Sequence, residues 1–218
     1  VGTGAKRYIT SQFEDMGTNV ILIQPGKTDK KTAAGPPVSS SKGKLTLSDV
    51  EALLKNAQSL SAVSGVMFGA GVVKNDQSTY YVNILGANEQ LNRIFNVNII
   101  EGSYFTKEDE EAGKRVVVLG YNIKQNLFGS ETALGKLVKV NESEHRVIGI
   151  IKPSGDKLGF NMDEMVFIPT KSALRLFNSD RLFGIRASAK SRIGMDDAVS
   201  ELTAILKERH NNEEDFTI

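Results

Sequence analysis

The sequence of 218 residues contains no cysteine. This absence excludes disulfide bonds and thiolate metal sites, and it fits a bacterial cytosolic protein as well as an extracytoplasmic one that does without disulfides. Long apolar runs are also missing, because no stretch approaches the roughly 18 apolar residues of a membrane-spanning helix. No basic segment precedes an apolar core at the start, as a signal peptide would require. We therefore expect these residues to form a globular fold.

The chain also lacks an excess of charge of either sign. It carries 27 Lys and Arg against 26 Asp and Glu, a formal net charge of +1. No block of basic residues forms a phosphate-binding stripe, so nucleic acid is not expected as a partner. Hydrophobic residues make up 40% of the chain, which is enough for the core of one large domain or of two small ones.

The usual catalytic and metal-binding motifs are absent. His145 and His210 have no partner at metal-ligand spacing, and we expect both on the surface, with His210 as a cation at a helix end. The segment 129–136 has one residue too many for a phosphate loop and is followed by Leu137 instead of Ser or Thr, so we interpret it as a turn. No G-x-S-x-G elbow occurs. These observations favour a non-catalytic domain with no cofactor or metal of its own.

Two further patterns have ordinary structural interpretations. Gly65, Gly69 and Gly71 lack the last glycine of the dinucleotide-binding fingerprint and lie in a predicted strand, where glycine marks a bulge or a close backbone approach. The acidic run 108–111 lacks the alternating ligands and central glycine of a calcium loop, and we expect it to be the solvated first turn of a helix. Neither pattern predicts a bound ligand.

The two ends of the chain each predict a strand, a helix and a strand. The first end has strands at 19–23, 61–74 and 79–85 and a helix that begins with a capping box of Ser48 and Glu51. The second has a strand at 183–189, a helix from Gly194 to His210 and an extended piece from Asp215. Together they predict the split ferredoxin-like arrangement, in which helices cover one face of an antiparallel sheet.

The middle of the chain, residues 87–178, predicts a small inserted α/β subdomain. It contains a strand at 116–119, a helix around 123–128, a hairpin of 136–140 with 146–151 and a strand at 166–168, after which Thr170 caps a short helix. The predicted fold class is therefore α+β, with a discontinuous ferredoxin-like subdomain formed by residues 1–86 and 179–218 around this insertion.

Apolar residues in predicted loops are the candidate contact sites. Tyr104 and Phe105 follow a polar turn, and Leu158 and Phe160 lie in the polar segment 152–164. Aromatic side chains are favoured anchors at protein interfaces. For Tyr104 and Phe105 the sequence favours the other interpretation, that they fill the core of the insertion.

Short motifs in one order along nearly the whole chain resemble a known family. They are Met16-Gly17-Thr18-Asn19, Glu101-Gly102, Val116-Val117-Val118-Leu119-Gly120, Leu127-Phe128, Val147-Ile148-Gly149-Ile150, Ile168-Pro169, and Leu206 to His210 followed by Asp215-Phe216. In this order and spacing the chain is similar to the extracytoplasmic core domain of MacB-type ABC transporter permeases.

The resemblance implies a membrane-anchored domain on the outer side of the cell (inner) membrane, either periplasmic or extracellular. Residues 1–16 would be a stalk helix that continues a transmembrane helix, and Ile218 would lead back towards a second one. The discontinuous subdomain would be the porter-like part. ATP and magnesium would bind only to a nucleotide-binding domain outside these residues.

The same likeness implies the partners and the passage. Two copies of the permease would face each other across a twofold axis and contact a membrane-fusion or adaptor protein, and ATP hydrolysis would reach this domain as movement. Phe160 would be a gate residue near the central passage, with Leu158, Tyr104 and Phe105 as interface candidates. The exported substrate could be a macrolide, a peptide, a toxin or a siderophore-like compound, and lipoprotein-releasing permeases share the architecture.

Two other classes of function remain open from the sequence. An independent secreted binding or adaptor module would bind a ligand tightly by itself. A secreted hydrolase would need paired titratable groups, for which Asp163 with Glu164, or Glu142 with Glu144, are the first candidates.

Overall fold

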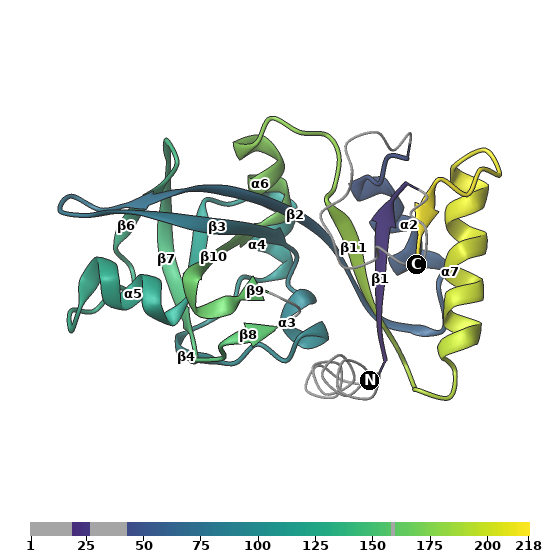
Figure 1. Ribbon diagram of the computed structural model, residues 1–218, viewed down its shortest axis with the longest axis horizontal. Helices are drawn as coiled ribbons and strands as arrows, with labels where there is room; N and C mark the ends of the chain where they lie inside the picture. Colours follow the sequence, from purple (N-terminus) through teal and green to yellow (C-terminus); the bar gives the residue numbers. More distant parts are fainter. Residues whose placement is uncertain (1–18, 27–42, 158–159) are drawn as a thin grey trace, which may run out of the picture.

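The computed structural model describes residues 19–26, 43–157 and 160–218, which form an elongated molecule around one large mixed sheet (Figure 1). The predicted stalk helix at 1–16 lies outside the described residues. Within them, no helix is both long enough and apolar enough to cross a membrane.

One end of the molecule is ferredoxin-like, as the sequence predicts. Its elements are β1 (Val20–Pro25), α2 (Leu47–Asn56), β2 (Leu60–Lys74), β11 (Gly184–Ala189), α7 (Met195–Arg209) and β12 (Phe216–Thr217). The strands lie in the order β12, β1, β11, β2, and every neighbouring pair is antiparallel. This is the order that two β-α-β units produce when the last strand of each unit flanks the other unit's first strand.

The remaining elements extend the same sheet beyond β2. They are β3 (Thr79–Ala87), α3 (Leu91–Ile94), β4 (Ile99–Gly102), α4 (Lys107–Ala112), β5 (Val116–Leu119), α5 (Tyr121–Phe128), β6 (Leu137–Val140), β7 (Ser143–Ile151), β8 (Asp156–Lys157), β9 (Phe160–Asn161), the 3₁₀ turn η1 (Met162–Glu164), β10 (Met165–Pro169) and α6 (Thr170–Leu176). From β2 the order continues β3, β10, β5, β7, β4, and β6 pairs with both β2 and β7. The pairs β3–β10 and β5–β7 are parallel.

The long strand β2 joins the two ends of the molecule. Its first part, up to Val66, pairs with β11, and its later part, from Met67 to Lys74, pairs with β3. At about 3.3 Å per residue, its 15 residues span roughly 50 Å. The predicted domain boundaries, between residues 86 and 87 and between residues 178 and 179, stay a prediction, because β2 belongs to the sheet at both ends of the molecule.

Apolar side chains on the helix-covered face hold the ferredoxin-like end together. Ile23, Leu53, Leu202 and Leu206 are fully buried between the sheet and the two helices α2 and α7. Two further clusters lie beyond it, one of which contains Phe105 and Phe167. That cluster also includes Ala62 and Val66 of β2, so it continues from one end of the molecule to the other.

Two predicted helix caps are wrong. The capping box of α2 is formed by Thr46 and Asp49, not by Ser48 and Glu51, because the helix begins at Leu47. The second cap fails because Thr170 is the first residue of α6, and its hydroxyl donates to the carbonyl of Gly65 (3.0 Å).

Asp49 also ties α2 to α7. Its Oδ2 accepts from the Thr46 N–H (2.8 Å), and its Oδ1 accepts from Arg209 Nε (2.7 Å). Burial alone would raise the pKa of this carboxyl, but the hydrogen bonds from Arg209 and Thr46 outweigh burial and lower it.

Candidate functional site

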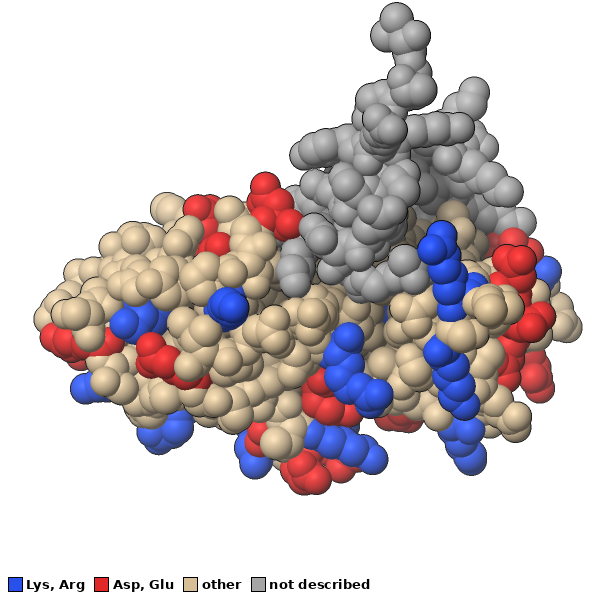
Figure 2. Space-filling model, turned by 90° about the horizontal axis from the view of Figure 1, so that it is seen from below, with Lys and Arg blue, Asp and Glu red and all other residues tan. Residues whose placement is uncertain are grey.

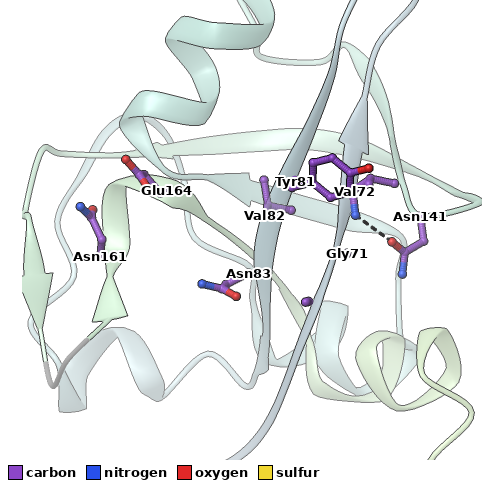
Figure 3. Close-up of a pocket in the computed structure, with 9 residues that line it drawn as sticks. Gly71, Val72, Tyr81, Val82, Asn83, Asn141, Asn161 and Glu164 are labelled. Atoms are coloured by element: carbon purple, nitrogen blue, oxygen red, sulfur yellow. Dashed lines mark hydrogen bonds between the residues drawn. The ribbon is translucent and has the colours of Figure 1, made fainter.

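A groove lies across the exposed face of the hairpin formed by β2 and β3 (Figure 3). Its floor comes from residues that face each other in register, Ala70 with Asn83 and Val72 with Tyr81. Successive strand residues point to opposite faces, so these four side chains share one side of the hairpin. Val82 and Ile84, which alternate with them, are buried on the other side.

The hollow has a volume of about 500 Å³. It is lined by Ala70, Gly71, Val72, Tyr81, Val82, Asn83, Asn141, Asn161 and Glu164. Three of these side chains are amides, and only one, Glu164, carries a charge. Tyr81 is 91% exposed, which is unusual for so large a side chain. The groove therefore presents hydrogen-bonding amides around apolar groups.

Asn141 forms one rim of the groove and is held against β2. It has a positive φ of 53°, which asparagine tolerates in a tight turn, and it sits between β6 and β7. Its N–H donates to the Val72 carbonyl (2.8 Å), and its Oδ1 accepts from the Val72 N–H (2.9 Å). A Cβ at Gly71 would lie 2.5 Å from that Oδ1, so a larger residue there would displace the Asn141 side chain.

The opposite rim is held by Asp163. Its two carboxylate oxygens accept from the backbone N–H groups of Ser154 (2.8 Å) and Gly155 (3.0 Å). The Asp163 N–H in turn donates to Oδ1 of Asn161 (3.0 Å). These bonds fix the segment that carries Asn161 and Glu164 beside the groove.

The predicted gate residue lies next to this rim. The backbone of Phe160 pairs with Lys157 in the small β8–β9 hairpin, directly before the groove residue Asn161. The structure does not describe the side chain of Phe160, and Leu158 lies outside the described residues. The gate role of Phe160 and the interface role of Leu158 stay predictions.

The interface role of Tyr104 and Phe105 is wrong. Their side chains are 8% and 2% exposed, and they belong to a core cluster between the sheet and its surrounding loops, with ring centroids 4.0 Å apart. A side chain buried in this way has no surface to offer a partner. The alternative drawn from the sequence, that they fill a core, is the one that burial supports.

A buried polar pair lies at the same place. Tyr104 Oη and Oε2 of Glu110 are buried without a hydrogen-bond partner in the described part of the chain. Burial raises the pKa of Tyr104, and the nearby carboxylate of Glu110 raises it further. Glu110 lies in the predicted acidic turn at 108–111, but unlike a solvated residue it is only 8% exposed.

The surface prediction is wrong for His145. This side chain is 1% exposed, its Nδ1 lies 2.9 Å from the Ser143 carbonyl, and burial lowers its pKa. His210 does lie at a helix end, as the residue that follows α7, but its side chain is only 10% exposed and pairs with Asp215 and Asp49.

The proposed acid pairs do not assemble a catalytic centre. Both oxygens of Asp163 accept backbone bonds, and Glu142 forms an exposed ion pair with Lys74 (3.4 Å). Across the described ranges, no three His, Asp or Glu side chains are grouped so as to hold a metal ion. Figure 2 shows acidic and basic side chains interspersed over the face in view.

The sheet order defines a class of protein: a ferredoxin-like α+β domain that carries a second α/β part on the same sheet, with a groove on its long hairpin. The family is more specific. The family model of the MacB-like periplasmic core domain matches residues 1–205, and the chain belongs to this family.

Curated relatives agree with this family. The chain is 29% identical over its whole length to the pyoverdine export ATP-binding/permease protein PvdT of Pseudomonas savastanoi pv. phaseolicola, of which it covers 32%. It is 29% identical over its whole length to the macrolide export ATP-binding/permease protein MacB of Wolinella succinogenes, of which it covers 33%. The chain thus spans about a third of the length of these relatives.

Solved structures share the fold. The periplasmic region of MacB from Actinobacillus actinomycetemcomitans superposes with a TM-score of 0.79 at 23% identity, over 96% of this chain and 92% of that one. The extracellular domain of the transporter YknZ from Gram-positive bacteria has a TM-score of 0.74 at 19% identity, over 91% of this chain and 98% of that one.

Proposed function

We propose that this chain is the non-catalytic outer domain of an ABC-type export permease, anchored in the cell membrane and moved by ATP hydrolysis elsewhere in the transporter. Membership of the MacB-like periplasmic core family supports the proposal. The relatives named above are export ATP-binding/permease proteins, and the chain corresponds to about a third of each. ATP and magnesium would bind to the nucleotide-binding domain of the parent transporter.

The position of the two described ends carries the proposal. The Asn19 carbonyl accepts from the Ala189 N–H (2.9 Å), so the chain enters β1 at the end of the sheet where β11 finishes. The last strand, β12, runs antiparallel to β1 and therefore points towards that same end (Figure 1). A domain inserted between two membrane helices requires entry and exit on one side. Phe216 and Thr217 lie beside Pro25 and Gln24, at the far end of β1, and the direction of β12 back towards the start of β1 supports the proposal.

The long strand β2 is suited to transmit movement. It belongs to the ferredoxin-like sheet at one end and to the groove-bearing hairpin at the other. Because a hydrogen-bonded strand resists stretching, a tilt of the ferredoxin-like end would move the groove as well. We assign the porter-like role to residues 1–86 together with residues 179–218. Residues 87–178 would form the inserted second subdomain.

The partners in this proposal are a second copy of the permease, a membrane-fusion or adaptor protein, and the exported substrate. Phe160 is the proposed gate residue, and its place beside Asn161 puts its backbone at the rim of the groove. The adaptor and the passage would then meet at the end of the molecule that lies farthest from α7.

The first experiment is to sequence the gene on both sides of the coding region for residues 1–218. We expect apolar stretches of about 20 residues on each side. A frame that instead begins with a cleavable signal and ends near Ile218 would contradict the permease and favour a secreted binding module or enzyme.

A second experiment tests the mechanical role in the parent transporter. These 218 residues contain no cysteine, so a Cys pair that replaces the facing residues Leu22 and Arg186 can lock β1 to β11 once any cysteine elsewhere in the transporter has been replaced. A matched pair within the β6–β7 hairpin, at Lys139 and Glu144, is the control. Transport that continues with a Phe160→Ala variant would refute the gate role alone, because the rest of the proposal does not depend on it.

A further inference from the structure

The outer edge of β2 has a gap in its hydrogen-bonded ladder. On the side away from β3, β11 pairs with β2 as far as Val66, and β6 pairs with it only from Val73. Between these points, no strand of the described chain lies along this edge. An unpaired strand edge is a template for an added strand.

The backbone of Ala70 points into this gap. Both backbone groups of Val72 bond to Asn141, on the side away from β3. Backbone direction alternates along an antiparallel strand, so the N–H and carbonyl of Ala70, two residues earlier, point the same way. Ala70 is exposed, and within the described ranges these two groups have no partner.

The groove adjoins this edge and adds side-chain chemistry to it. Ala70 and Val72 give apolar contact, Tyr81 stands 91% exposed beside them, and amides surround them. Amides donate and accept hydrogen bonds, as a peptide backbone does. Glu164 is the only charged lining residue, so the local field favours a neutral or positively charged occupant.

The shape of the groove also restricts the occupant. Pockets for small molecules enclose most of the ligand surface, whereas this groove is open along an exposed hairpin face. A free strand edge with flanking side-chain contacts is the mode by which an extended peptide adds to a sheet. An exposed tyrosine is a favoured anchor for such a partner.

We propose that the edge of β2 at Ala70, together with the groove, binds an extended, uncharged or basic peptide segment of a partner protein. The segment pairs with the backbone of Ala70 and lays alternate side chains against Val72 and Tyr81. The inference rests on the proposed function only in taking the partner to be a protein that works with the transporter.

The test uses the chain itself and three acetylated, amidated octapeptides. The first alternates Thr and Val between terminal Lys residues, the second has Glu at both ends, and the third is the first with alternate backbone nitrogens methylated. Hydrogen exchange of the Ala70 amide, followed by NMR, is the measurement. When the Lys-ended peptide fills about nine-tenths of the sites, we expect exchange to slow about tenfold, because only free protein exchanges.

The other two peptides separate backbone pairing from charge. We expect the Glu-ended peptide to bind up to about fivefold more weakly, which is the effect of one exposed charge at the rim of a binding site. We expect the methylated peptide to give the Ala70 amide no protection from exchange. Equal binding of the methylated peptide, or no protection by the Lys-ended one, would overturn the proposal.

A pair of variants tests the same edge. Ala70→Pro removes the outward N–H without breaking the ladder to β3, and Ala70→Ser keeps that N–H. We expect only the proline variant to lose binding, and binding by both would overturn the proposal. If Ala70→Pro does not fold, Tyr81→Ala replaces it, and unchanged affinity in that variant would overturn the proposal. Peptide binding does not depend on flanking membrane segments, so its failure and that of the permease proposal are distinguishable.

Discussion

Replacing Glu110 with glutamine should change how the stability of the domain depends on pH. The Glu110 side chain is 8% exposed, and its Oε1 accepts from the Lys171 N–H (3.3 Å) while Oε2 has no partner in the described part of the chain. Burial raises its pKa from 4.5 to about 7, and the Glu89 carboxylate adds to this, against the opposing effect of Thr170 and Lys171. Tyr104 also faces this carboxyl.

The sign of the effect follows from proton linkage. Between pH 4.5 and about 7 the unfolded chain has lost the Glu110 proton while the folded chain still holds it. Unfolding therefore releases a proton, and the free energy of unfolding falls as the pH rises through this window. The pKa difference corresponds to about 3 kcal/mol. Above pH 7 the folded state carries the full free-energy cost of the buried, charged Glu110, and below pH 4.5 this cost vanishes.

Glu110→Gln keeps an acceptor for the Lys171 N–H and removes the titration. We expect the variant to match the wild type near pH 4.5 and to be more stable by about 3 kcal/mol at pH 8. Urea unfolding at half-unit pH intervals measures this difference. The control is Glu111→Gln on the same helix, where the side chain is 62% exposed and faces Lys107. Parallel curves for Glu110→Gln and the wild type would refute the reasoning.

Three further substitutions have definite expected outcomes, each measured by the urea midpoint. Arg186 is 7% exposed and faces no carboxylate within the described ranges, and burial lowers its pKa to about 10. Arg186→Met should therefore stabilise the domain by about 2 kcal/mol. A lower stability of the variant would show that the fold needs the guanidinium. Asp49→Ala removes the partner of Arg209 and should cost about 2 kcal/mol, whereas Glu51→Ala should cost under about 0.5. Because burial lowers the pKa of His145, its charging opposes folding, so His145→Phe should gain stability relative to the wild type as the pH falls below 6.5; a difference between the two that does not change with pH would contradict this.

The periodic segments were predictable, and the details at their ends were not. The richness of residues 61–74 in Val, Met, Phe and small residues predicts β2, and the stripe of apolar residues in 195–206 predicts α7, because both signals are local to the segment. The cap of α2 was assigned two residues late, since Ser48 and Glu51 match the same motif as Thr46 and Asp49. The start of the helix at Leu47 and the bonds of Asp49 to Thr46 and Arg209 distinguish the two alternatives.

The candidate site was less predictable than the fold. Phe160 was singled out from its polar surroundings, and its backbone does lie beside the groove, but Asn141 and Asn161 carried no sequence signal. Asparagine in a turn is common, so nothing in the sequence distinguishes one that bonds to a strand 69 residues earlier. Tyr104 and Phe105 were misassigned as interface residues because exposure depends on neighbours far along the chain.

The sequence by itself determined the order of the strands and helices, the ferredoxin-like arrangement of the two chain ends and the lack of a recognisable catalytic motif. These follow from local periodicity and from short-range chain connections. Tertiary structure alone decided that β11 stops at Val66 and β6 starts at Val73, leaving the edge at Ala70 open, and that Asn141 and Asn161 line the same groove from opposite rims. A gap in a sheet is a relation among strands distant in sequence, and no local pattern encodes it.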